Sequence, residues 1–135
     1  MKTLYHARLF ASEEDGETHF EDVPVDLERE FLIQPNEPLP CSIPMTAEGV
    51  FWIGAPQAWK CDKAHPALSR RMFVTLKGEY QVRASDGQTR KFPVGSVLVL
   101  DDVTGAGHST EILSPEGVVV LAVSLRSRSH PDFRD

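Results

Sequence analysis

The sequence predicts an all-β domain, a barrel or sandwich built from short strands. Ten prolines and nine glycines punctuate its 135 residues, and no window of about 12 residues keeps a helical period. Short apolar segments instead recur at a spacing of about 8–12 residues with turn signals between them, which is typical of sandwiches and barrels. A hydrophobic fraction of 41% lets a chain of this length close one core without disulfides or a metal ion.

The composition disfavours several classes of partner. Fourteen basic and twenty acidic side chains give a net charge of −6, which argues against nucleic acid and anionic membranes. The longest apolar run, residues 117–123, is far shorter than the roughly 20 residues of a membrane-spanning helix. No apolar stretch precedes Glu13, so we expect no secretory signal. Cys41 and Cys61 form no CxxC motif, and we expect two free thiols and a cytoplasmic protein.

Residues 1–49 are expected to form N-terminal strands and an extended arm. Alternation over residues 4–7 and the extended stretch at residues 19–27 indicate the strands, with an acidic turn between them. Four prolines then occur between Gln34 and Pro44. Each proline removes an amide donor and biases the residue before it towards extended backbone. We expect this proline-rich arm to pack on the barrel.

Residues 50–126 carry the remaining strands, and residues 127–135 form a polar tail. The lysine–glycine pair at residues 77–78 indicates a tight hairpin. The expected strands end at turns that contain glycine or proline; they are Val50–Ile53, Met72–Leu76, Glu79–Arg83, Thr89–Phe92, Ser96–Leu100, His108–Leu113 and Val118–Leu125.

Four stretches between Gly54 and His108 carry a family resemblance; they are Leu76–Glu79, Ser85–Gly87, Phe92–Val97 and Asp101–His108. Together they resemble the two motifs of the cupins, a family of small jelly-roll β-barrels. The resemblance covers about half of the chain. It implies a single cupin jelly-roll β-barrel, here with an N-terminal extended arm. It also implies a binding pocket or a metal centre inside the barrel.

The metal positions of the cupin motifs are only partly kept. Arg71 stands at the position of the ligand glutamate and Ala67 at one of the histidine positions, whereas His65 and His108 match. Asp101 or Asp102, just ahead of Gly105, would supply a carboxylate that completes a mixed nitrogen–oxygen site suited to divalent iron, manganese, nickel or zinc. The candidate metal ligands are His65 and His108, which the resemblance implies, together with Asp102.

Strand parity assigns further side chains to the interior. Alternation places Phe73 and Thr75 on the face of Arg71, and a two-residue turn after this strand pairs Thr75 with Tyr80. In cupins the first-motif histidine, here His65, points into the barrel, so this face is expected to be internal. The candidate ligand-binding residues are Arg71, Phe73, Tyr80, His108 and Thr110.

An inward guanidinium at Arg71 would change the electrostatics of the interior. A fixed positive charge repels a divalent cation, whereas a ligand carboxylate or phosphate can neutralise it through a two-pronged hydrogen-bonded pair. Two alternatives leave Arg71 without a ligand. It could form an internal ion pair with Glu79, Asp101 or Asp102, or it could lie outside the barrel.

Three classes of function remain open. The first is a barrel that binds a small organic anion in its interior. The second is a metal-dependent oxygenase or isomerase with His65 and His108 as ligands. The third is a structural barrel that acts by self-association. Because exposed sheet edges invite pairing with another chain and the arm is a natural exchange element, we expect a homodimer.

Overall fold

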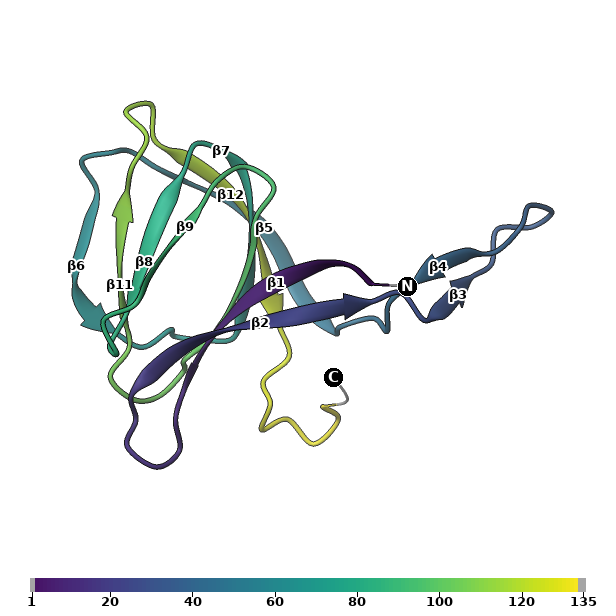
Figure 1. Cartoon of the computed structure of the whole chain (residues 1–135), viewed down its shortest axis with the longest axis horizontal. Coiled ribbons are helices and arrows are strands. Elements are labelled where there is room, and N and C mark those ends of the chain that lie inside the picture. Colours follow the sequence, from purple (N-terminus) through teal and green to yellow (C-terminus); the bar gives the residue numbers. More distant parts are fainter. Residues whose placement is uncertain (1, 134–135) are drawn as a thin grey trace.

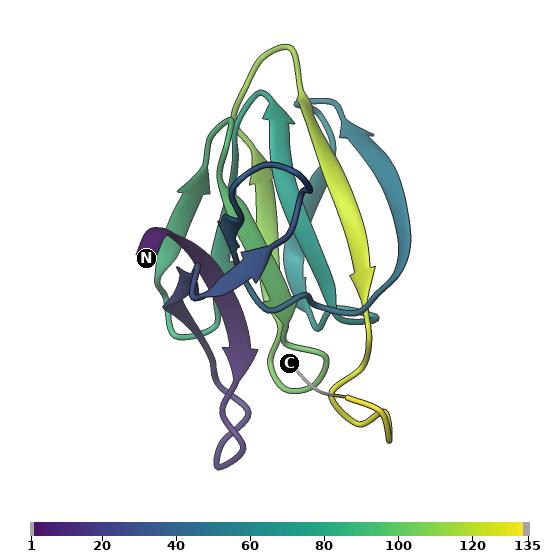
Figure 2. The same cartoon turned by 90° about the vertical axis from the view of Figure 1, so that its right-hand side faces the viewer.

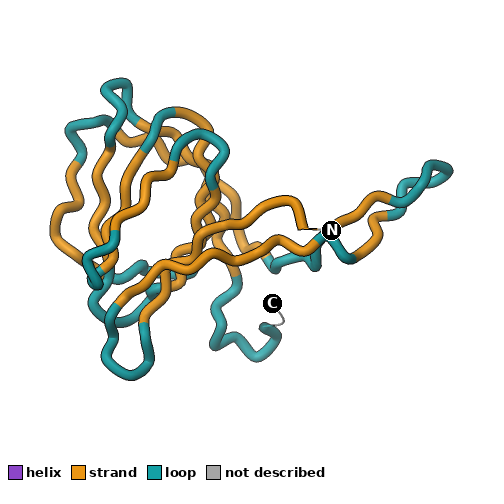
Figure 3. Tube along the Cα trace, in the orientation of Figure 1, coloured by secondary structure: helices purple, strands orange, loops and turns teal. Residues whose placement is uncertain are grey.

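The computed structural model describes residues 2–133, with side chains described from Leu4 onward. Every regular element in this range is a β-strand (Figure 3), which confirms the all-β prediction. None of these residues belongs to a helix long and apolar enough to span a membrane. The strands are β1 (Lys2–Ala11), β2 (Thr18–Asp26), β3 (Arg29–Phe31), β4 (Leu39–Cys41), β5 (Ala47–Ala55), β6 (Lys60–His65), β7 (Arg71–Lys77), β8 (Tyr80–Ala84), β9 (Thr89–Phe92), β10 (Val97–Asp101), β11 (His108–Ile112) and β12 (Val118–Leu125).

Strands β5 to β12 form a jelly roll. They are arranged as two four-stranded groups, in the orders β5–β12–β7–β10 and β6–β11–β8–β9, and neighbours within each group are antiparallel. This order, in which strands far apart in the chain pair, is that of a double Greek key. The core lies between the groups, with Leu98 and Val120 from the first and Val82 and Ile112 from the second. The expected jelly roll is confirmed.

The N-terminal strands extend the first sheet. β1 pairs in parallel with β10 and antiparallel with β2, so this sheet has six strands. β3 and β4 pair with each other and project from the two sheets (Figure 1). In Figure 2 this hairpin points toward the viewer. Its side chains at residues 29–40 are exposed.

One local expectation is wrong. β7 and β8 form no hairpin, because they belong to opposite sheets and the chain passes from one sheet to the other at Gly78, whose φ of 75° favours glycine. His65 and Arg71 lie on different strands, since β6 ends at His65 and β7 begins at Arg71. Pro66 lacks the amide donor that a continuous ladder would need. The connection at Gly78 nevertheless leaves Phe73 and Tyr80 facing the same cavity between the sheets.

Candidate functional site

A cavity of about 370 Å³ lies between the two sheets. Its walls are mainly apolar and come from the inner faces of both sheets, including Phe73, Leu98 and Val120 on one side and Val82 and Ile112 on the other. A few polar side chains interrupt this lining. A concave, mainly apolar space with few polar groups is the usual form of a small-molecule site.

All five residues predicted to bind a ligand line this cavity; they are Arg71, Phe73, Tyr80, His108 and Thr110. They come from both sheets, on β7, β8 and β11. His65, at the end of β6, lines the same cavity. Parity grouped Arg71 with Phe73 on one face of β7, and this face lines the cavity as the cupin resemblance implied, although His65 lies on a different strand.

Arg71 has no counter-ion among the residues that the structure describes. Its Nε atom is buried and makes no hydrogen bond, and the guanidinium carbon lies 5.7 Å from the centre of the Phe51 ring. The internal pairs considered with Glu79, Asp101 and Asp102 do not form in the described chain. Arg71 thus brings positive charge to an apolar cavity.

His108 is oriented by a buried carboxylate. Its Nδ1 atom lies 2.6 Å from Oδ2 of Asp102, and the two residues are 5% and 0% exposed. Because a carboxylate accepts, Nδ1–H donates, and Nε2 is the ring nitrogen that remains for other partners. The ring of His65 lies 5.5 Å away, centre to centre.

Tyr80 contributes a buried hydroxyl to the cavity. The residue is 4% exposed, and its hydroxyl makes no hydrogen bond of ordinary geometry. Burial raises the pKa of this phenol, and the nearby Thr75 hydroxyl offsets only part of the rise. Tyr80 therefore stays protonated, and its hydroxyl can donate a hydrogen bond to a ligand.

Cys61 and His65 form a second polar pair at the cavity wall. Sγ of Cys61 lies 2.8 Å from Nε2 of His65, and Nδ1 of His65 lies 2.9 Å from the carbonyl oxygen of Pro66. Because a carbonyl accepts, Nδ1–H donates to it, so in the neutral ring Nε2 accepts the thiol proton. Burial raises the pKa of Cys61, a backbone hydrogen bond from Thr110 opposes the rise, and the charge of Asp62 adds to it.

Sequence reasoning missed this pair. The sequence predicts that Cys61 is a free thiol, and it is free in the structure. The sequence analysis did not predict the His65 imidazole beside it. Residues four apart on a strand share a face, and this spacing could have placed Cys61 beside His65. The spacing was not applied, because residues 60–65 are polar without apolar alternation and no strand was expected there.

The described residues do not fit the metal centre that the family resemblance implies. Among them, no three histidine, cysteine, aspartate or glutamate side chains converge to hold an ion. Asp102, a predicted ligand, instead hydrogen-bonds to His108. Arg71 also faces the cavity that would hold the metal.

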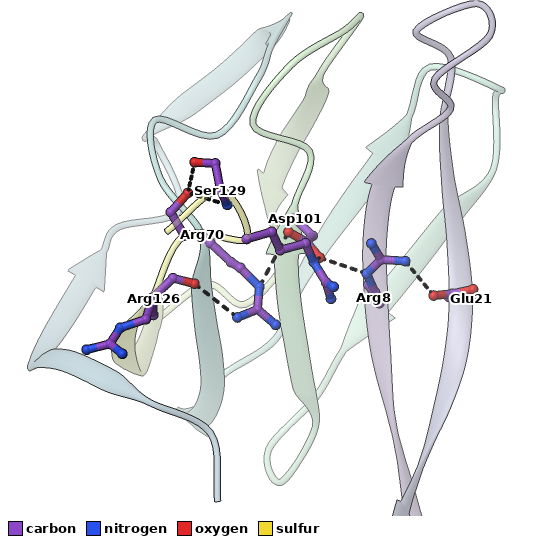
Figure 4. Close-up of polar contacts among 8 residues, drawn as sticks. Arg8, Glu21, Arg70, Asp101, Arg126 and Ser129 are labelled. Carbon is purple, nitrogen blue, oxygen red and sulfur yellow. Dashed lines mark hydrogen bonds and ion pairs between the residues drawn. The ribbon is translucent and has the colours of Figure 1, made fainter. Parts of the chain in front are cut away.

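Arginine side chains cluster around Asp101 at the end of β10 (Figure 4). Its carboxylate lies 2.8 Å from Nε of Arg8, 2.6 Å from Nε of Arg128 and 3.4 Å from Nε of Arg70. Burial alone would raise the pKa of Asp101, but hydrogen bonds from Arg8 and Arg128 and their charges outweigh it and hold this pKa below its usual value. The cluster joins β1, β10 and the C-terminal tail.

No protein-family model matches the chain, and no curated protein matches its sequence. One similar solved structure is the Cnp3 cupin domain of Schizosaccharomyces pombe, with 12% identity, a TM-score of 0.46 and coverage of 92% of this chain and 89% of that one. Another, from Salmonella typhimurium LT2, is described as ethanolamine utilization protein Q, with 15% identity, a TM-score of 0.39 and coverage of 93% and 99%.

The class of the protein follows from its own strand order. That order is a jelly roll, which is the fold that the resemblance to cupin motifs implies.

We predict that Asp101→Asn lowers the free energy of unfolding by about 1–3 kcal/mol near neutral pH. A carboxyl whose pKa is lower in the folded than in the unfolded state, where it is about 3.9, stabilises the fold above that value. The contribution is lost as the pH falls through the folded pKa. Urea unfolding of both proteins from neutral pH to about pH 3 should show the difference shrinking in acid.

Asp22→Asn is the matched control, because Asp22 pairs with Arg90 at the surface with 61% of its side chain exposed. This variant should unfold almost like the native protein. A difference for Asp101→Asn that stays constant across the pH range would contradict the role of the charged cluster.

Proposed function

We propose that the protein binds a small organic anion in the cavity between the sheets. The observation that carries the proposal is Arg71, a guanidinium that faces an apolar cavity and has no counter-ion in the described chain. A ligand carboxylate can satisfy it through two parallel hydrogen bonds. The cavity volume of about 370 Å³ suits a compact organic molecule.

The other polar groups of the cavity would orient the ligand. The Tyr80 hydroxyl can donate a hydrogen bond, and Nε2 of His108 is held in place by the bond between Nδ1 and Asp102. Phe73 offers an apolar surface for the body of the ligand. The free thiols of Cys41 and Cys61 support a reducing compartment such as the cytoplasm.

We predict that Arg71→Leu abolishes binding of small carboxylates and leaves the fold intact, because no internal carboxylate loses its partner. His108→Ala should weaken binding less, by about 0.5–3 kcal/mol for one hydrogen bond. Calorimetric titration with acetate, pyruvate and benzoate measures the affinity, and thermal unfolding checks the fold.

Arg83→Leu serves as the control, since Arg83 is exposed and lies outside this cavity. It should bind as the native protein does. Unchanged affinity of the Arg71→Leu protein, or no binding of any of the three carboxylates by the native protein, would contradict the proposal.

Self-association is the second candidate function, and the projecting hairpin favours it. Phe31, Leu32 and Leu39 are 56%, 65% and 51% exposed. Large apolar side chains on a hairpin that projects from its own domain are typical of a surface that another chain covers. We propose that a second copy of this chain covers them.

The outer face of the first sheet offers the complementary surface. A groove of about 720 Å³ runs over β1, β2, β7, β10 and β12, and Met72, Val99 and Val123 contribute to its apolar floor. The groove begins beside residues 42–47, at the base of the arm. Two copies could therefore exchange arms symmetrically, each hairpin lying on the other's sheet.

We predict that the native protein is a dimer at micromolar concentration and that Phe31→Ser combined with Leu32→Ser makes it a monomer. The substitutions remove apolar surface that the proposed interface buries. Size-exclusion chromatography with light scattering measures the mass. Val94→Ser is the control, because Val94 is 64% exposed but lies on the turn before β10, and it should remain dimeric. A native monomer would contradict the proposal.

A further inference from the structure

The Cys61 thiol has a base beside it that the binding proposal does not use. The His65 ring lies 2.8 Å from Sγ, and its other nitrogen donates to the carbonyl of Pro66 at 2.9 Å. This backbone bond orients the imidazole and leaves its unprotonated nitrogen toward the thiol. A nucleophile, a base within hydrogen-bond reach and a third group that orients the base are the parts of an activated nucleophile.

The position of the thiol gives it access to a ligand. Cys61 lines the interior cavity together with Arg71 and Tyr80. It also lines a more polar groove of about 540 Å³ over the second sheet. The thiol therefore lies in the wall between the anion cavity and an outer groove.

A second, independent feature of the cavity points to a ligand with an additional oxygen atom. The Tyr80 hydroxyl is buried and makes no hydrogen bond of ordinary geometry, although it lines the same cavity. A donor of this kind suits a carbonyl oxygen, and it suits better the alkoxide that forms when a nucleophile adds to that carbonyl.

We propose that Cys61 and His65 form a reactive thiol–imidazole pair that adds reversibly to the carbonyl carbon of small aldehyde or 2-oxo carboxylates held in the cavity. This inference rests on the proposed anion site, because Arg71 would hold the carboxylate. In the addition, the Sγ–carbon bond forms while the carbonyl π bond breaks. The thiol proton passes to Nε2 of His65 and from there to the new hydroxyl oxygen, so that no oxidant or reductant is needed.

Alkylation by iodoacetamide tests the pair. In that reaction the Sγ–carbon bond forms, the carbon–iodine bond breaks, iodide leaves and His65 takes the proton. Cys41 is a control within the same molecule, since it is a second free thiol of similar, intermediate exposure. Although burial raises the pKa of Cys61, His65 can remove the thiol proton as the Sγ–carbon bond forms. We therefore expect Cys61 to react at least about tenfold faster than Cys41, as followed by mass spectrometry of the two peptides.

His65→Gln tests the base without removing a buried side chain, because His65 is exposed. We expect it to slow alkylation of Cys61 at least about tenfold, with no change at Cys41 and with thermal unfolding as a check on the fold. Equal rates at the two cysteines in the native protein, or no effect of His65→Gln on Cys61, would overturn the reactive pair.

Glyoxylate tests the ligand class and separates this inference from the anion site. Added before iodoacetamide, it should protect Cys61 and leave Cys41 unprotected, whereas acetate, which has no electrophilic carbonyl, should protect far less. A rate that depends on His65 but is not reduced by glyoxylate would overturn the carbonyl ligand. If the titrations show anion binding that depends on Arg71 while Cys61 has no enhanced reactivity, the anion site stands and the thiol chemistry fails.

Discussion

Asp101 and its neighbour Asp102 occupy the position on which the candidate site depends. Asp101 lies on the outer side of the first sheet, where Arg8 and Arg128 reach its carboxylate, and Asp102 lies inside, against His108. Side chains at successive positions of extended chain point to opposite faces. The ion cluster on the outer side therefore fixes the backbone at Asp101. The next residue, Asp102, orients His108 in the cavity. Two buried carboxylates in sequence are tolerated because each has a basic partner.

The jelly-roll connections bring the remaining site residues together. The chain crosses between the sheets at Gly78, so Arg71 and Phe73 of β7 and Tyr80 of β8 reach one cavity from opposite sides. Gly107 makes a second contribution, since a Cβ atom there would collide with the backbone of His65. Close approach of β11 to β6 at this glycine keeps the two histidine rings 5.5 Å apart.

Much of the fold could be predicted because short apolar runs between turn residues mark the buried strands. Residues 97–101 and 118–125 are such runs and form β10 and β12. Parity placed Arg71 on the face of Phe73, and the cupin resemblance implied that this face is inward. The sheet to which each strand belongs could not be predicted. The sequence of the turn at residues 77–78 is the same whether the flanking strands pair with each other or join different sheets. The β6 strand and its Cys61–His65 pair were missed, since a polar edge strand has no apolar signature.

The central claim is that an anion enters the cavity and meets Arg71. A crystal structure of the protein grown with 4-bromobenzoate tests this most directly, because the bromine can be located by its anomalous scattering. The account predicts a bromine peak between the two sheets, with the carboxylate within hydrogen-bond distance of the Arg71 guanidinium and the ring against Phe73. Bromine found only outside the sheets, or a carboxylate turned away from Arg71, would contradict it.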